Sequence, residues 1–254
     1  MKRPDWYKYG WTLDIKNSSW TEDTEKQVDF VIQALGLRGG ERILDLACGY
    51  GRHALSLAHR GFSVVGVDIT PAYVEDAAQN AEKEKLPAKF ILSDIRDIVF
   101  ENEFDAVLNL ADGAIGYLEN DAENLKIFDG IARALKPGGR HFMDICNAEH
   151  ARRHFPKKSW EPGEKSLSLA QFDWDEATRR MLYGGWSIPY GQPAQKPALR
   201  LENANPTRLY DLLELEGILR QRDMEIFAAY SDYYGREATH KELQLMVCSR
   251  KADA

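Results

Sequence analysis

Residues 43–54 read ILDLACGYGRHA, an apolar strand pattern followed by a glycine turn and the start of a helix. Asp45 is the carboxylate of this strand, and Gly49 and Gly51 lie in the turn. Glycines let backbone amides approach a ligand closely, and a helix N-terminus adds partial positive charge. The stretch therefore predicts a strand–turn–helix unit at which a nucleotide-like ligand contacts the backbone.

Short apolar strands and helical segments alternate along the chain after this unit, which is the sequence form of a sheet with right-handed crossovers. Seven strands are expected, over residues 42–47, 62–68, 88–92, 104–110, 140–146, 225–234 and 243–251. The helices between them are expected over residues 51–60, 71–85, 120–135 and 211–221. Ligands of such sheets bind beyond the carboxyl ends of the strands, so residues at those ends are the candidates for function.

The alternation of strand and helix patterns stops between about residues 150 and 205. Pro and Gly recur there, and polar and apolar residues alternate in runs such as SLSLAQFDW and RRMLYGGWSI. Alternation with a period of two is typical of antiparallel strands with one solvated face. We interpret this stretch as antiparallel β hairpins inserted into the α/β frame.

Composition narrows the class of protein. Among 254 residues, 33 Lys and Arg stand against 40 Asp and Glu, and a net charge of -7 disfavours nucleic acid as a partner. The three cysteines are far apart in the sequence, which argues against a disulfide framework or metal cluster and fits a reducing cytoplasm. No apolar run approaches the roughly 20 residues that span a bilayer, so no membrane partner is expected.

Two further acids follow strands of the predicted sheet. Asp68 ends the second strand, 17 residues after Gly51, where a carboxylate can accept both hydroxyls of a ribose. Its alternative role is to cap the following helix, although Thr70 is the better placed cap. Asp94 follows the third strand and can accept from an adenine amino group, with Ile69 and Ile95 as apolar ring contacts.

The glycine turn is also compatible with a second ligand class. Gly49, Gly51 and Ala54 fit the dinucleotide pattern G-x-G-x-x-G/A, which would bind a pyrophosphate. Asp45 would repel a pyrophosphate, but it would attract an ammonium or sulfonium group. The alternative role of Asp45 is to accept hydrogen bonds from local loop amides.

Taken together, LDLACGYG, Asp68, Asp94 and the LKPGGR run at 135–140 resemble the class I S-adenosylmethionine-dependent methyltransferase family. The resemblance covers most of residues 40–146 and about the last 45 residues. It implies a Rossmann-like doubly wound seven-stranded mixed sheet whose last strand is antiparallel. It also implies S-adenosyl-L-methionine as cofactor and S-adenosyl-L-homocysteine as product.

The resemblance assigns roles to individual residues. Asp45, the backbone of Ala47 and Gly49, and the carbonyl near Leu110 would contact the methionine end of the cofactor. In related enzymes an N-terminal segment folds over the cofactor, and the aromatic stretch DWYKYGWTLDIKNSSW offers rings that suit a sulfonium. Tyr9 is the predicted contact there, either with the cofactor carboxylate or within the lid. The alternative is aromatic packing on the surface of the sheet.

Three regions follow from this reading. Residues 1–40 form an aromatic lid and a first helix, and 41–150 with 206–254 form the cofactor-binding domain. Residues 151–205 form a β-rich substrate cap, because members of the family differ in substrate chiefly in that region and at the N-terminus. A small-molecule acceptor is the expected partner, and a homodimer through the inserted β region is an alternative use of the same surface.

The predicted reaction is an in-line displacement that moves the methyl group to an oxygen or nitrogen nucleophile of a small molecule. The candidate bases are Asp112 and Tyr117 after the fourth strand, and His150 and His154 after the fifth. His150 and His154 can share a helix face, but no third ligand accompanies them, so no metal site is predicted. The sequence lacks N-P-P-Y and Pro-Cys motifs, which disfavours base methylation.

Two other functions stay open on the sequence alone. A non-catalytic protein that binds S-adenosylmethionine or S-adenosylhomocysteine would keep Asp45, Asp68 and Asp94 without turnover. An NAD-dependent oxidoreductase would use the same glycine turn for a pyrophosphate. Retention of NAD binding after Asp45→Asn would favour the second of these.

Overall fold

The computed structural model describes residues 5–194 and 205–253; residues 1–4, 195–204 and 254, including ten of the predicted insertion, lie outside the described residues. Seven strands form one sheet in the order β10-β11-β5-β4-β1-β2-β3. They are β1 (Arg42–Leu46), β2 (Ser63–Asp68), β3 (Ala88–Leu92), β4 (Phe104–Asn109), β5 (Leu135–Cys146), β10 (Met224–Tyr230) and β11 (Gln244–Lys251). Only β11 runs antiparallel to its neighbours among these strands, so the predicted mixed sheet is confirmed.

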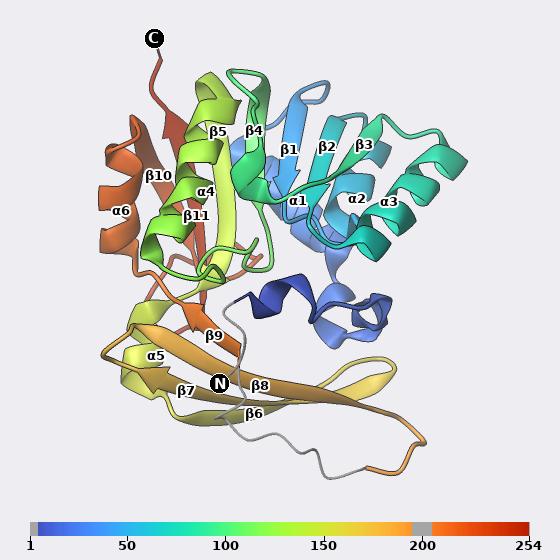
Figure 1. Cartoon of the computed structure of the whole chain (residues 1–254), viewed down its shortest axis with the longest axis vertical. Helices are drawn as coiled ribbons and strands as arrows, with labels where there is room; N and C mark the ends of the chain where they lie inside the picture. Colours follow the sequence, from blue (N-terminus) through green and yellow to red (C-terminus); the bar gives the residue numbers. More distant parts are fainter. Residues whose placement is uncertain (1–4, 195–204, 254) are drawn as a thin grey trace.

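Helices cover both faces of this sheet (Figure 1). They are α1 (Thr24–Leu35), α2 (Arg52–His59), α3 (Pro71–Glu84), α4 (Asp121–Ala134) and α6 (Leu212–Arg220), whereas α5 (Ala148–His154) lies beyond the end of β5. Adjacent residues of β1 point to opposite faces, so Ile43 lies in the core beneath α1 and α2 while Leu44 lies in the core beneath α4 and α6. Each fully buried side chain of this kind contributes roughly 1.5–3 kcal/mol to folding.

The strand order reverses between β1 and β4. The chain runs outward from β1 to β2 and β3, then returns past β1 to continue with β4 and β5. Loops on the two sides of this reversal diverge, which leaves a crevice at the carboxyl ends of β1 and β4. Asp45 within β1, Asp68 at the end of β2, Asp94 after β3 and the loop after β4 all lie toward this edge.

A second sheet of four antiparallel strands lies beyond that edge (Figure 1). We call it the cap sheet; it comprises β6 (Lys157–Pro162), β7 (Ser166–Asp175), β8 (Arg180–Pro189) and β9 (Asn205–Arg208). The alternating pattern around residues 150–205 correctly predicted hairpins. Several boundaries differ from the prediction. Helix α5 precedes the first hairpin, the KPGG run belongs to β5 instead of interrupting the chain before it, and β10 ends at Tyr230 instead of residue 234.

Gly116 joins the two sheets. The backbone N–H of Arg208 in β9 donates to the Gly116 carbonyl oxygen at 2.8 Å. A Cβ atom at Gly116 would lie 1.9 Å from the Arg208 carbonyl oxygen, and Gly116 has a φ of +86°. Only glycine allows this contact between the β4 loop and the cap sheet.

The N-terminal segment lies between the main sheet and the cap sheet, in blue in Figure 1. It is folded into three short 3-10 turns, η1 (Trp6–Lys8), η2 (Leu13–Asn17) and η3 (Ser19–Thr21). Tyr73 of α3 donates its hydroxyl to the Thr12 carbonyl oxygen at 2.9 Å, and the Ser19 and Ser168 hydroxyls lie 3.2 Å apart. The segment is therefore attached both to the main domain and to the cap sheet.

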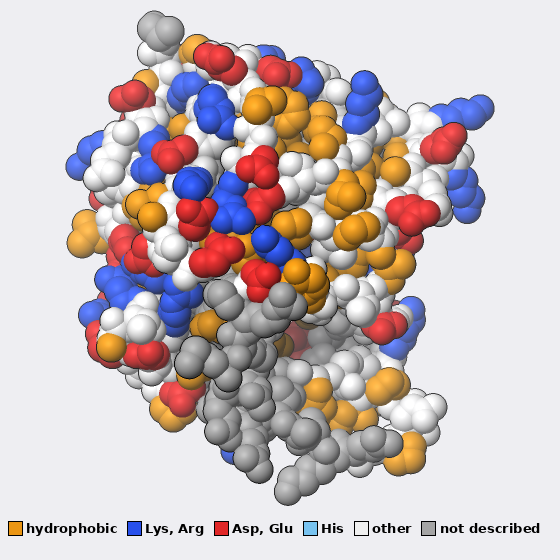
Figure 2. Space-filling model, viewed as in Figure 1, with side chains coloured by type: hydrophobic (Ala, Val, Ile, Leu, Met, Phe, Trp, Pro, Cys, Tyr) orange, Lys and Arg blue, Asp and Glu red, His pale blue; other side chains and the backbone are white. Residues whose placement is uncertain are grey.

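Charges on the face that carries α4 and α6 are mixed, with Lys and Arg interleaved with Asp and Glu (Figure 2). Some of these charges are paired; for example, Arg222, just after α6, contacts Asp129 of α4 at 2.8 Å. Among the described residues, no helix combines the length and the apolar composition that crossing a bilayer requires.

Candidate functional site

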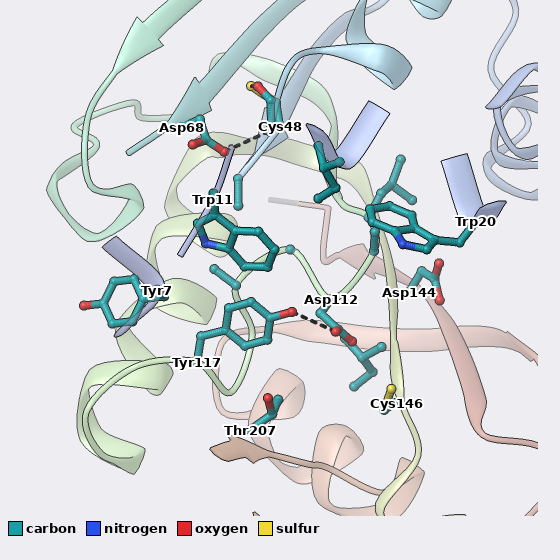
Figure 3. A pocket seen from close by; sticks show the side chains of 18 of the residues that line it. Tyr7, Trp11, Trp20, Cys48, Asp68, Asp112, Tyr117, Asp144, Cys146 and Thr207 are labelled. Carbon is teal, nitrogen blue, oxygen red and sulfur yellow. Dashed lines mark hydrogen bonds between the residues drawn. The ribbon is translucent and has the colours of Figure 1, made fainter. Parts of the chain in front are cut away.

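A cavity of about 780 Å³ lies between the carboxyl ends of the parallel strands, the N-terminal segment and the cap sheet. Its size is within the range of small-molecule sites. Two groups of side chains line it: those after β1, β2 and β3 on one side, and those of the β4 loop, the end of β5 and the cap sheet on the other. Figure 3 shows both groups. We call them the nucleotide side and the cap side.

The turn between β1 and α2 forms the floor of the nucleotide side. Ala47 and Gly49 have φ values of +55° and +58°, and both line the cavity. A Cβ atom at Gly49 would meet no atom closer than 3.9 Å, so the glycine leaves open space on the cavity side. Backbone can therefore approach a ligand at this turn, as the sequence predicted.

Gly51 has a different role from the predicted one, since it does not line the cavity. A Cβ atom there would lie 2.8 Å from Phe90 and 2.9 Å from Ala77. Its φ of +78° also favours glycine at the start of α2. Gly51 thus allows α2 to pack against β3 and α3, and the prediction that it faces the ligand is corrected.

Asp45 is a buried carboxylate with an unpartnered oxygen. Its side chain is 1% exposed, and Oδ2 has no hydrogen-bond partner. Burial raises the pKa of the Asp45 carboxyl to about 7, although the Arg52 guanidinium opposes the rise. Burial of an unpaired carboxylate costs folding free energy unless a cation or a hydrogen-bond donor contacts it. The local loop amides that might have satisfied Oδ2 do not do so.

Removing this acid is expected to stabilise the protein without ligand. Because the folded-state pKa of Asp45 is raised, stability is lost as the pH rises from about 4 through 7. Asp45→Asn removes this cost, so at pH 8 the free energy of unfolding should increase, by at most about 4 kcal/mol. Urea denaturation at pH 8 and pH 5 tests this. A variant that is less stable than the wild type at pH 8 would contradict it.

Asp68 holds the glycine turn in place and also lines the cavity. Oδ2 accepts the N–H of Gly49 and Oδ1 accepts the N–H of Thr70, each at 2.8 Å. Burial raises the pKa of Asp68, while these backbone hydrogen bonds lower it. Thr70 occupies the N-cap position of α3, but its side chain makes no capping hydrogen bond, so that expectation is corrected.

Asp94 completes the nucleotide side together with two apolar neighbours. Arg96 Nη2 contacts Asp94 Oδ2 at 2.6 Å, and the Arg96 Nε–H donates to Oδ1 at 3.0 Å. These contacts lower the pKa of Asp94 against the effect of burial. Ile69 and Ile95 line the cavity beside it, and so does Leu110 at the end of β4. The structure therefore brings most of the predicted cofactor contacts together.

Tyr9, like Gly51, does not line the cavity, and its side chain is 65% exposed. The rings that reach the cavity from the N-terminal segment are Trp6, Tyr7, Trp11 and Trp20. In a 3-10 turn, neighbouring residues point in different directions, and the sequence did not indicate which of them faces inward.

Asp112 lies in an unusual left-handed turn on the cap side. Four consecutive residues, 111–114, have φ values between +51° and +69°. This conformation costs roughly 1–2 kcal/mol for each residue with a Cβ atom, and such strain is typical of functional sites. The Asp112 N–H donates to the Asp144 carbonyl oxygen at 2.8 Å, which fixes the turn to the end of β5.

The Asp112 carboxylate and the Tyr117 hydroxyl form a pair in the cavity (Figure 3). Tyr117 donates its hydroxyl to Asp112 Oδ2 at 2.9 Å. Burial raises the pKa of Asp112 to about 6, although this hydrogen bond lowers it. A carboxylate with such a pKa can hold or release a proton near neutral pH, which is the property of a general base. Both residues were predicted candidates.

His150 does not reach the cavity. It is 4% exposed in α5, its Nδ1 lies 3.2 Å from the His240 carbonyl oxygen, and its ring lies 4.5 Å from the ring of His154. The shared helix face was predicted correctly, but α5 turns it away from the strand ends. His154 does not line the cavity either, so both histidines are withdrawn as candidate bases. Within the described ranges, no cluster of His, Cys, Asp and Glu has metal-site geometry.

Arg52 and Asp144 are among the polar cavity residues that the sequence analysis did not identify. Arg52, the first residue of α2, donates through Nη1 to Gln27 Oε1 at 2.6 Å and lies over the ring of Trp20. Asp144, two residues before the end of β5, accepts hydrogen bonds from the Tyr233 hydroxyl at 2.6 Å and from Gln244 Nε2 at 2.5 Å. Applying the strand-end rule to the fifth strand would have identified Asp144.

The cap sheet closes the far side of the cavity. Its inward residues are Glu161, Phe172, Met181, Tyr183, Asn205 and Thr207. Residues paired across antiparallel strands share a face, and Phe172 pairs with Tyr183 at a ring separation of 5.2 Å. The inward face of the cap sheet is thus aromatic and polar. Trp160 lies on the opposite face of this sheet and is exposed.

Comparisons with known proteins agree with this arrangement. A family model described as a methyltransferase domain matches residues 43–139. The putative methyltransferase YqeM of Bacillus subtilis (strain 168) is 25% identical over 217 residues, 83% of this chain and 84% of that protein. The chain spans about half the length of the next two curated relatives, 54% and 45%.

Solved structures share the fold over nearly the whole chain. The CcbJ methyltransferase of Streptomyces caelestis superposes with a TM-score of 0.73 at 18% identity, covering 98% of this chain and 96% of that one. An S-adenosylmethionine-dependent methyltransferase of Clostridium acetobutylicum ATCC 824 gives 0.72 at 16% identity, covering 94% and 96%. At these identities the likeness establishes the fold.

Proposed function

We propose that this chain, which belongs to the class I S-adenosylmethionine-dependent methyltransferase family, transfers the cofactor's methyl group to an oxygen or nitrogen nucleophile of a small molecule. The cofactor occupies the nucleotide side of the cavity and the acceptor occupies the cap side. The observation that carries the proposal is the unpartnered Oδ2 of Asp45 beside the open turn at Gly49. A cationic nucleoside is the ligand that both features accommodate.

The nucleotide side fits the proposed cofactor group by group. Asp45 faces its positive charge, and the backbone of Ala47 and Gly49 cradles its methionine end. Each Asp68 oxygen accepts one backbone N–H and keeps a further lone pair, so the carboxylate can also accept ribose hydroxyls. Asp94, kept ionised by Arg96, can accept from the adenine amino group.

Arg52 replaces Tyr9 as our candidate for the cofactor carboxylate. Its guanidinium lines the cavity at the beginning of α2, where the helix dipole also favours an anion. Nη1 is held by Gln27 and Thr24, so the group is positioned before a ligand arrives. A planar guanidinium suits a carboxylate because it can donate two parallel hydrogen bonds.

Bound S-adenosylmethionine supplies an electrophilic methyl group on a sulfur that is a good leaving group. The chain's own residues supply alignment, exclusion of water and a place for the acceptor's proton. Asp112 is the candidate base, and Tyr117 orients its carboxylate through the hydrogen bond to Oδ2. This pair favours turnover over a purely binding role, since a binding protein has no need of a strained acid beside the cofactor.

Titration calorimetry with S-adenosylmethionine, S-adenosylhomocysteine and NAD in parallel tests the cofactor assignment. We expect micromolar binding of the first two ligands and none of NAD. Binding of NAD alone would refute the proposal. Binding without any methyl transfer to a broad set of hydroxyl and amine compounds would favour the non-catalytic alternative.

Loss of the paired rings of the cap side should weaken acceptor binding alone. We expect Phe172→Ala and Tyr183→Ala each to raise the acceptor KM roughly 3- to 10-fold, because each removes aromatic contact with the acceptor. The dissociation constant of S-adenosylmethionine should stay unchanged. Trp160→Ala, on the outer face of the same sheet, is the matched control. Equal losses of acceptor and cofactor affinity would contradict a separate acceptor side.

A further inference from the structure

We propose that the acceptor is an amine, bound as its ammonium ion on the cap side and anchored by Asp112. This inference rests on the proposed methyltransferase function and narrows its acceptor to one chemical class. It is carried by the charges that line the cavity, by the aromatic rings beside Asp112, and by the turn that points Asp112 inward.

The cavity lining is strongly acidic. Its carboxylates are Asp23, Asp45, Asp68, Asp94, Asp112, Asp144 and Glu161. Among the lining residues within 5–194 and 205–253, the single permanent cation is Arg52. His53 also lines the cavity, but burial lowers the pKa of its ring well below the usual value, so it is neutral. An anionic acceptor would therefore meet repulsion that an ammonium ion does not.

The nucleotide side uses only part of this negative charge. Asp94 is neutralised by Arg96, and the cofactor's own positive charge offsets Asp45. Asp112, Asp144 and Glu161 remain on the cap side, and no described ion pair joins any of them to a Lys or Arg. The cap side thus carries carboxylates that no described ion pair neutralises, and a bound ammonium group would supply a positive charge there.

Aromatic rings surround the position next to Asp112. Tyr117 lies 5.0 Å from the ring of Trp6 and is stacked on Trp11 at 6.2 Å. Phe172 and Tyr183, whose rings lie 5.2 Å apart, line the same cavity from the cap sheet. The faces of such rings attract cations, and the attraction grows when water is excluded. A carboxylate framed by aromatic rings is a typical recognition site for an ammonium ion.

The left-handed turn fixes Asp112 in the position from which it anchors the ammonium ion. Residues 111–114 carry the strain, the Asp144 carbonyl holds the turn, and Tyr117 occupies one position on Oδ2. A carboxylate has about four acceptor positions, so N–H groups of an ammonium can still bind it. The titratable groups that face Asp112 are Tyr117 on its own loop, Asp144 and Cys146 of β5, and Tyr183 of the cap sheet.

The same contact prepares the nucleophile. One ammonium N–H bond breaks, its electron pair stays on nitrogen, and the proton adds to the Asp112 carboxylate. Burial disfavours both charged partners, so exclusion of water shifts the pair toward neutral amine and carboxylic acid. The freed lone pair takes the methyl group, whose bond to sulfur breaks with its electron pair left on sulfur. The proton then leaves Asp112 for solvent.

Three ligands of equal size test the charge preference on protein saturated with S-adenosylhomocysteine: benzylamine, benzyl alcohol and benzoate, at pH 7.5. Titration calorimetry should give a dissociation constant at least 10-fold lower for benzylamine than for the other two. Asp112→Asn should reduce the affinity for benzylamine about 10-fold and leave benzyl alcohol unchanged. Asn tolerates the left-handed conformation as Asp does, so the turn should persist in this variant.

Controls separate this inference from the function on which it rests. Glu75→Gln removes the same charge from the exposed face of α3 and should leave all three affinities unchanged. Failure to bind S-adenosylhomocysteine would refute the proposed function itself. Normal binding of that ligand with equal affinity for the amine and the alcohol, or with tighter binding of benzoate, would overturn the ammonium assignment alone.

Discussion

Replacing Asp112 with Asn is expected to lower kcat roughly 10²- to 10⁴-fold, the usual contribution of a general base. The amide keeps the size and the tolerance of the left-handed turn, but it cannot take a proton. The dissociation constant of S-adenosylmethionine should change little, since Asp112 lies on the cap side. Steady-state kinetics with a methylated acceptor, together with calorimetry of cofactor binding, measures both quantities.

The pH profile distinguishes a base from a structural residue. Asp112 must be ionised to act, so kcat of the wild type should fall as the pH drops through about 6. Tyr117→Phe removes a hydrogen bond that lowers the pKa of Asp112, so this fall should shift to higher pH. In Asp112→Asn the fall should be absent. A kcat that is unchanged by Asp112→Asn would exclude Asp112 as the base.

Replacing Asp45 with Asn should weaken S-adenosylmethionine binding by about 2–5 kcal/mol, the cost of removing one partner of a buried charge pair. The variant should nevertheless be more stable than the wild type without ligand at pH 8. Opposite effects on affinity and stability indicate an acid that is kept for binding. Calorimetry and urea denaturation of one preparation provide both values. Cofactor affinity equal to that of the wild type would contradict the role of Asp45.

Proton release gives an independent test of the same residue. Burial raises the pKa of Asp45 to about 7 in the free protein, and a bound cation should lower it. Near pH 7 the wild type should therefore release a fraction of a proton on binding, and its affinity should fall as the pH is lowered. Calorimetry in buffers of different ionisation enthalpy measures the release. Asp45→Asn is the control, because it has no proton to lose.

The sequence predicted the frame of the site because one rule governs it. In a parallel sheet, the residues at or just after the carboxyl ends of the strands meet at one edge, so Asp45, Asp68, Asp94 and Asp112 all reach the cavity. The β-rich insertion was predicted for a similar reason, since alternation with a period of two is visible in single strands. Both signals are local in the chain.

The errors concern side chains whose direction depends on distant packing. Gly51 was assigned to the ligand, but Phe90 and Ala77 fill the space that faces it. His150 follows a strand end as Asp112 does, but it lies in a helix that turns away from the cavity. Arg52 was overlooked because only the fold of residues 24–27 against α2 gives its guanidinium a position.

The structure of the protein with S-adenosylhomocysteine tests the central claim most directly, because the ligand carries the sulfur from which the methyl group leaves. We predict its ribose hydroxyls at Asp68, its amino acid end between Asp45 and Arg52, and its sulfur open toward Asp112 and Tyr117. A ligand bound outside this cavity, or one whose sulfur faces away from the Asp112–Tyr117 pair, would contradict the account.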